Sequence, residues 1–300
     1  MCKLRFLIVF GILFCWSSLT HAGEAPEVMV YRYWDWEKTP LRDDYQYDLL
    51  KLALEKTSNT YGPYKTYRFK KYFTSLRARR EINRGEYINV HAAPWRDVSI
   101  VNEDESLQID TPIFSLLGFR QLIIRKEDVD LFNSITSEEK LKKLVLAQGQ
   151  DWVDVNIYKQ NGYLVDSSAN FPYMLDMLAR NRFDYIPMSI VEVESVLSAR
   201  PDLADKITIA PNLLIYYPLP ILFYVDNHRT DLKQRLAAGL KIIASDGSMA
   251  ELHNQYFASK VNYIRQNTTR IFILENHLVP KNLLESEAAT FSKIRDEATE

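Results

Sequence analysis

Short apolar runs alternate with helix-forming segments through the middle third of the sequence. The apolar runs are Leu144–Ala147, Tyr163–Val165 and Phe183–Ile186, and helical patterns at Tyr173–Arg180 and Val191–Ala199 follow the last two. Strands that alternate with helices of about ten residues predict a parallel sheet covered by helices. Because ligands of such sheets bind at the carboxyl ends of the strands, the loops after these runs are the first candidates for a binding site.

The flanking segments extend this α/β pattern. Strands are expected at 28–33, 67–69, 87–92 and 207–210, and helices at 45–56, 75–83, 232–244 and 250–257. No internal repeat and no linker rich in glycine and serine divides the chain. Two long extended segments, near 117–125 and 213–224, are therefore expected to cross between two lobes.

Residues 1–22 have the order of a secretory signal. Lys3 and Arg5 precede an apolar run at 6–16, and small and polar residues end the segment at Ala22. The run is shorter than the roughly 20 apolar residues that a membrane-spanning helix needs. We therefore predict cleavage after Ala22 and export to the periplasm; an uncleaved anchor is the alternative. Both cysteines of the chain lie in this segment, so the exported protein would have no disulfide.

The composition argues against several classes of function. A formal net charge of −2 provides no general basic surface for nucleic acid. The sequence has no zinc-ligand spacing, no glycine-rich phosphate loop and no Gly-x-Ser-x-Gly motif. We therefore predict no metal, no cofactor and no enzymatic activity. No second long apolar run is present, so the mature chain is expected to be soluble and monomeric.

Four stretches between residues 27 and 260 stand out by their order and spacing. They are YQYDLL at 45–50, DTPIF at 110–114, MLARNRFDY at 177–185, and YPLPI at 217–221 continuing to SDGS at 245–248. Together they resemble the bacterial extracellular solute-binding protein family 3, the polar-amino-acid-type periplasmic binding proteins.

This resemblance implies an α/β, two-lobed type II periplasmic-binding-protein-like fold. The ligand cleft would lie between lobes joined by two crossing strands. Lobe 1 is expected to be discontinuous, formed by 23–120 and 218–265, with lobe 2 inserted at 121–217. Residues 266–300 are expected to form a C-terminal helical extension.

The sequence departs from the family pattern at the residues that would contact the carboxylate and the ammonium of an amino-acid ligand. Arg96 corresponds to the arginine that grips the ligand carboxylate, but Ala93 replaces the expected threonine before it. Ser189 lies where the family usually has an aspartate for the ligand ammonium, and a serine cannot neutralise that charge. The stretch 98–106 also looks inserted. A standard free amino acid is therefore in doubt as the ligand.

Loop positions after the expected strands supply the candidate site residues. Tryptophans there offer flat surfaces for stacking, an arginine offers a fork for a carboxylate, and helix starts favour anions. The alternatives are core packing for the tryptophans, a surface pair with Asp97 for Arg96, and helix capping for the small polar side chains. The predicted ligand-binding residues are Trp34, Trp95, Arg96, Gln150, Trp152, Asn170 and Ser189.

These observations predict a periplasmic solute-binding protein. It would close on a small polar solute, amino-acid-like or carboxylate, and serve an ABC importer or a membrane sensor. One alternative is a periplasmic enzyme of the same fold, similar to cyclic acid dehydratases, with Asp35 or His91 as general acid. Another is a degenerate member that only docks a partner protein, which a cleft filled by its own tryptophans would favour.

Overall fold

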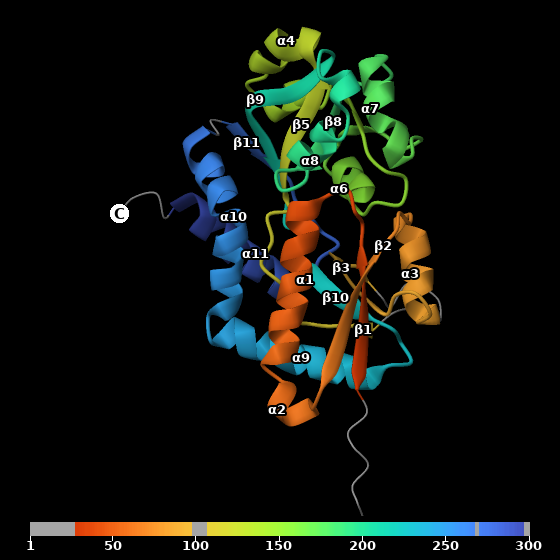
Figure 1. The fold of residues 1–300 in the computed structure, drawn as a ribbon. Coiled ribbons are helices and arrows are strands. Elements are labelled where there is room, and N and C mark those ends of the chain that lie inside the picture. Colours follow the sequence, from red (N-terminus) through yellow and green to blue (C-terminus); the bar gives the residue numbers. More distant parts are fainter. Residues whose placement is uncertain (1–27, 98–106, 268–269, 297–300) are drawn as a thin grey trace, which may run out of the picture.

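A computed structural model describes residues 28–97, 107–267 and 270–296. The predicted signal at 1–22 and the predicted insertion at 98–106 lie outside the described residues. Two sheets form the centres of two lobes, one above the other in Figure 1. The predicted α/β architecture with two lobes is therefore confirmed.

The first lobe, the lower one in Figure 1, has a five-stranded sheet in the order β2-β1-β3-β10-β4. Strands β1, β2 and β3 are parallel, and β10 runs antiparallel to β3 and β4. The strands are β1 Met29–Asp35, β2 Tyr64–Lys70, β3 Val90–Pro94, β4 Leu107–Gln108 and β10 Ile221–Val225. The helices are α1 Pro40–Glu55, α2 Ser58–Tyr61, α3 Ser75–Arg84, α9 Thr230–Ser245 and α10 Ser248–Asn267.

The second lobe has a six-stranded sheet in the order β11-β9-β5-β8-β6-β7. Strands β6, β7 and β8 are parallel, as the alternating pattern predicts, whereas β5 runs antiparallel to both β8 and β9. The strands are β5 Phe119–Arg125, β6 Val145–Ala147, β7 Leu164–Asp166, β8 Tyr185–Ser189, β9 Ile207–Tyr216 and β11 Arg270–Ile273. The helices are α4 Val129–Asn133, α5 Glu138–Leu141, α6 Asp154–Gln160, α7 Phe171–Ala179 and α8 Val193–Ser198.

The chain passes between the lobes at two crossing segments. One leads from β4 into β5, and the other, residues 217–220, joins β9 of the second sheet to β10 of the first. The long extended segment expected near 213–224 is therefore divided between two strands in different sheets. Pro218 and Pro220 lie between them, and proline has no N–H to donate to a strand ladder.

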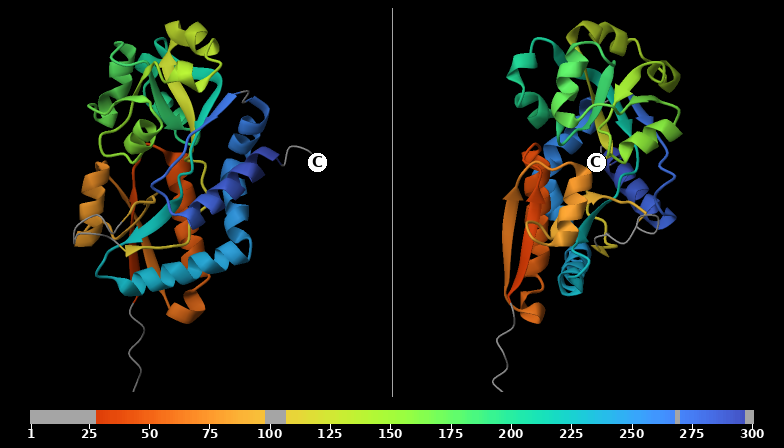
Figure 2. Two further views of the ribbon diagram at one scale, coloured as in Figure 1. Left: turned by 180° about the vertical axis from the view of Figure 1, so that it is seen from behind. Right: turned by 90° about the vertical axis from the view of Figure 1, so that its right-hand side faces the viewer.

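The C-terminal segment differs from the helical extension expected at 266–300. It contains β11, which pairs parallel with β9, as well as α11 Lys281–Asp296. The ring of Phe291 on α11 stacks on Phe119 and Tyr216, at the ends of the two strands that lead to the crossings. Helix α11 lies beside α10 at the level where the lobes meet (Figures 1 and 2). None of the described helices is long and apolar enough to span a membrane.

Candidate functional site

A cavity of ≈ 170 Å³ lies between the two lobes. Its lining residues follow the carboxyl ends of strands from both sheets, which is the edge where ligands of α/β sheets bind. The first lobe contributes residues after β1 and β3 and from α1 and α3. The second lobe contributes the loops after β6, β7 and β8.

The structure brings five of the seven predicted site residues to this cavity. Trp34 and Arg96 line it from the first lobe. Gln150, Trp152 and Asn170 line it from the second lobe, and the side chains of Gln150 and Asn170 are exposed.

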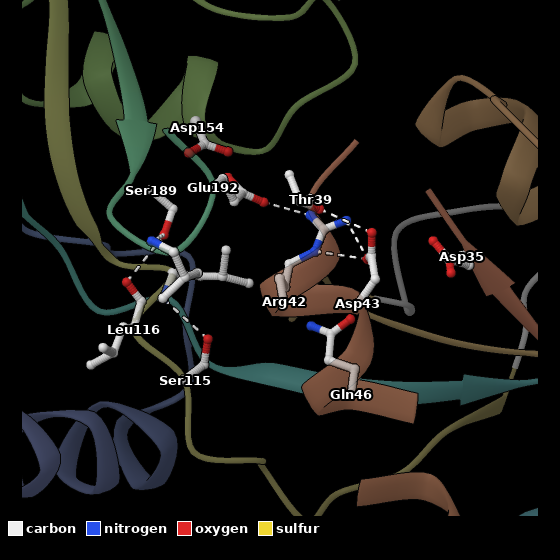
Figure 3. Close-up of polar contacts among 12 residues, drawn as sticks. Asp35, Thr39, Arg42, Asp43, Gln46, Ser115, Leu116, Asp154, Ser189 and Glu192 are labelled. Carbon is white, nitrogen blue, oxygen red and sulfur yellow. Dashed lines mark hydrogen bonds and ion pairs between the residues drawn. The ribbon is translucent and has the colours of Figure 1, made fainter. Parts of the chain in front are cut away.

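Ser189 and Trp95 are not among the lining residues. The buried hydroxyl of Ser189 donates to the Leu116 carbonyl at 3.3 Å and accepts the Val191 N–H at 3.4 Å, so it holds the turn after β8 against the crossing segment (Figure 3). Trp95 follows β3 and is half-buried, and its backbone N–H donates to the Pro220 carbonyl at 2.8 Å.

Aromatic rings from both lobes meet at the cavity. Trp36, which follows β1, lies with its ring centre 4.8 Å from that of Phe171 and 6.3 Å from that of Trp152. Trp34 lies 4.7 Å from the His91 ring, and its indole N–H donates to the Lys71 carbonyl at 2.8 Å. Trp36, in the loop after β1, and Phe171, the first residue of α7, are not among the predicted site residues.

A network of buried charges crosses from one lobe to the other (Figure 3). Arg42 on α1 contacts Glu192 of the second lobe at 2.5 Å and Asp43 of its own helix at 2.8 Å. Arg120 on β5 contacts Asp154 at 2.6 Å and Glu192 at 4.0 Å. All except Asp43 also line the cavity. The sequence does not predict these residues, because Arg42 and Glu192, like Arg120 and Asp154, lie far apart along the chain.

These ion pairs keep the two arginines charged. Burial alone would lower the pKa of Arg42, but Asp43 and Glu192 outweigh burial and raise it. Burial likewise opposes the raised pKa of Arg120, which results chiefly from Asp154. Burial raises the pKa of Asp43, with Arg42 acting against it. The network is thus a set of mutually compensating charges rather than a row of available ligand groups.

The first lobe also presents positive charge to the cavity. Arg79 on α3 and Arg96 after β3 both line it, and the guanidinium of Arg96 lies 4.5 Å from the centre of the Tyr224 ring. Burial, followed by Arg42, Arg96 and Arg79, lowers the pKa of His91 well below its ordinary value. His91 is therefore neutral, and its Nδ1 has no hydrogen-bond partner among the described residues.

The two residues proposed for a general acid are poorly suited to that role. Asp35 is buried outside the cavity lining and forms an ion pair with Arg68 at 2.5 Å. His91 lines the cavity, but a neutral imidazole lacks the additional proton that a general acid must donate. Within the described ranges, no group of histidine, cysteine, aspartate or glutamate side chains could hold a metal ion.

No family model and no curated protein matches the sequence. Solved structures do match it. An ancestral arginine-binding protein bound to arginine has a TM-score of 0.50 at 16% identity, over 76% of this chain and 98% of that chain. An arginine-specific periplasmic binding protein of Salmonella typhimurium has a TM-score of 0.51 at 12% identity, over 77% and 100%. The VFT2 domain of Bordetella pertussis BvgS, as a double mutant, has a TM-score of 0.52 at 14% identity, over 76% and 93%.

This chain has the two-lobed fold of the periplasmic binding proteins. The fold implied by the four sequence stretches is thereby confirmed. Its cavity lies between the lobes, where the carboxyl ends of the strands of both sheets converge. At these levels of identity the likeness concerns the fold, and the chemistry of the cavity has to be argued from this chain's own residues.

Proposed function

We propose that this chain is a periplasmic solute-binding protein that closes its two lobes on one small polar solute. The observation that carries this proposal is a cavity lined jointly by charged and aromatic side chains of both lobes. A solute that contacts both lobes stabilises the closed arrangement over the open one, because only the closed arrangement makes all the contacts. An ABC importer or a membrane sensor would then recognise the closed form.

The size of the cavity supports a single small solute. Its volume of ≈ 170 Å³ is close to that of an engineered cavity of about 150 Å³ that accepts benzene. A peptide or an oligosaccharide is much larger than that. The structural neighbours support binding as the role, because two of them are arginine-binding proteins.

A thermal-shift screen of residues 23–300 tests the proposal. The protein is first unfolded and refolded to remove any solute that it carries from the cell, and is then screened against amino acids and small carboxylates. A solute at a hundred times its Kd stabilises the folded state by about 2.7 kcal/mol, which raises Tm by roughly 4–5 °C for a chain of this size. Small-angle scattering on the same samples should show compaction.

Two matched variants locate the effect in the cavity. Trp152→Ala removes a lining side chain and should abolish most of the shift. Trp95→Ala removes an indole outside the lining and should retain it. If no small polar solute changes either Tm or the scattering profile, the proposal is wrong, and a role in docking a partner protein becomes the better explanation.

A further inference from the structure

The cavity has groups for an anion, whereas both of its buried carboxylates are already paired with arginines and so are not available to an ammonium. We infer that the solute is a small carboxylate that has one flat apolar group and no ammonium. This inference rests on the proposed function and specifies the class of solute that the same cavity would take. It would separate this chain from the binders of arginine among its structural neighbours.

The two buried carboxylates of the lining are already engaged. Asp154 accepts hydrogen bonds from Arg120 at 2.6 Å and from the hydroxyl of Tyr217. Glu192 contacts Arg42 at 2.5 Å and also faces Arg120. An ammonium would have to displace a guanidinium from one of them, which would leave that arginine buried without its partner.

The third carboxylate of the lining cannot replace them. Asp151 is exposed at the mouth of the cavity. An ion pair there lies in a medium of high dielectric constant and contributes little to affinity. Ser189, where the family pattern would have an aspartate, does not reach the cavity.

Positive groups of the first lobe are arranged for a carboxylate. Arg79 has no hydrogen bond or ion pair with any residue that the structure describes, although it is half-buried and lines the cavity. The Arg96 side chain and the neutral His91 ring line the same lobe. Of the four arginines in the lining, Arg42 and Arg120 are compensated by Asp43, Asp154 and Glu192. Arg79 is therefore the cation of the lining that the described contacts leave for a bound anion.

Helix ends add to this preference. Thr74 and Ser75, at the start of α3, line the cavity from the first lobe. Asn170 and Phe171, at the start of α7, line it from the second. The first N–H groups of a helix and its dipole both stabilise a nearby negative charge.

The aromatic side chains define the rest of the solute. Trp34, Trp36, Phe73, Trp152 and Phe171 supply flat apolar surface to the lining. Such surfaces bind best to a flat apolar group by stacked or edge-on contacts. Because the volume is only slightly larger than a cavity that accepts benzene, the solute has a single ring or a planar group of that size.

Binding of four matched compounds to refolded protein tests this inference by calorimetry. Phenylacetate has the ring and the carboxylate. Phenylglycine adds only the ammonium, phenylacetamide removes only the charge, and acetate removes only the ring. Phenylacetate should bind at least tenfold more tightly than each of the other three. Arginine and glutamine, each bound in a structure of an ancestral arginine-binding protein, are included and should bind no better than phenylglycine.

Two variants on one helix test the assignment of the anion-binding side. Arg79→Gln should weaken phenylacetate binding by at least tenfold, because it removes a charge-assisted contact. Arg80→Gln removes an equal charge from an exposed neighbour outside the lining and should leave the affinity unchanged. Equal weakening by both variants would mean that only the overall charge matters, and would overturn the assignment.

The remaining outcomes separate this inference from the proposed function. If phenylglycine, arginine or glutamine binds more tightly than phenylacetate, the class of solute is wrong while the solute-binding role stands. If none of these compounds binds and the wider thermal-shift screen also gives no response, the proposed function itself fails.

Discussion

Glu192 interacts with an arginine from each of the two lobes. One of its carboxylate oxygens lies 2.5 Å from Arg42 of the first lobe, and the other lies 4.0 Å from Arg120 of the second. Its side chain is only 6% exposed. A buried carboxylate between two buried guanidiniums compensates both, so its loss costs more than the loss of a surface ion pair.

Glu192→Gln should therefore destabilise the protein by about 3 kcal/mol, because it leaves Arg120 and Arg42 with fewer compensating charges. Urea unfolding followed by circular dichroism measures this. The control is Glu194→Gln, which removes a carboxylate that is 67% exposed and contacts Lys260; its cost should be below about 0.5 kcal/mol. Equal costs for the two variants would contradict the role assigned to the buried network.

The sequence predicts which loop residues line the cavity better than it predicts which distant residues form ion pairs. Trp34, Arg96 and Trp152 were predicted because they follow expected strands, and all three line the cavity. The ion pair of Arg42 with Glu192 joins residues 150 positions apart. A pattern within one segment cannot specify such a pair, because its geometry depends on how the lobes are placed.

Close contact between α1 and α9 requires a residue without a side chain. Gly239 lies in the middle of α9, and a Cβ built on it would overlap the backbone carbonyl of Ala53 on α1. Elsewhere in a helix, replacing glycine by alanine stabilises by roughly 0.5–1 kcal/mol. At Gly239 a methyl group has no room, so we expect the same replacement to destabilise the protein.

Gly239→Ala should thus destabilise the first lobe by about 1–3 kcal/mol, the usual cost of overpacking. The change in unfolding free energy is measured by urea denaturation. Lys241→Ala, on an exposed position of the same helix, controls for changes in helix propensity and should be nearly neutral. A stabilised Gly239→Ala variant would show that the two helices are free to move apart.

The elements differ in how well sequence predicted them, for identifiable reasons. Helix α3 was predicted almost to the residue because Thr74 caps its start and Gly85 adopts the left-handed conformation at its end. Helix α1 begins at Pro40, before the predicted start, since proline suits the first turn of a helix. Strand β11 was missed because its only pairing is with the distant β9.

Glu287 connects the C-terminal helix to a crossing segment. Its carboxylate accepts the N–H of Leu219, which also lines the cavity. Burial raises the pKa of Glu287 to about 7, although the Leu219 N–H acts against the shift. The folded state therefore favours the protonated acid. That contribution is fully present below pH 4.5, the ordinary pKa, and is lost as the pH rises through 7.

Glu287→Gln should match wild type in stability near pH 4.5 and exceed it by about 1–2 kcal/mol at pH 8.5, a figure reduced for the partial exposure of this side chain. Urea unfolding at a series of pH values gives the difference. Glu285→Gln, an exposed position on the same helix, should show no such trend. A difference between Glu287→Gln and wild type that does not change with pH would contradict the raised pKa.

For the molecule as a whole, contacts between the lobes set the balance between open and closed arrangements. The contacts described between the lobes at the cavity are the Arg42–Glu192 ion pair and the rings of Trp36, Trp152 and Phe171. Sequence resemblance predicted two lobes and their order along the chain. It could not predict these contacts, because each depends on the angle between two separately folded sheets.

Trp36→Ala should shift the protein toward the open arrangement without unfolding either lobe. It removes two aromatic pairs across the lobes, each worth about 0.5–1.5 kcal/mol, so the ratio of closed to open molecules should fall by roughly 5- to 150-fold. Because both cysteines lie within residues 1–22, Lys70→Cys and Lys159→Cys give one labelled position per lobe for energy transfer in the chain that lacks this segment. Tyr173→Ala removes an aromatic ring that is 64% exposed and should leave the transfer efficiency unchanged. The same efficiency in Trp36→Ala and wild type would contradict the role assigned to the Trp36 contacts in closing the lobes.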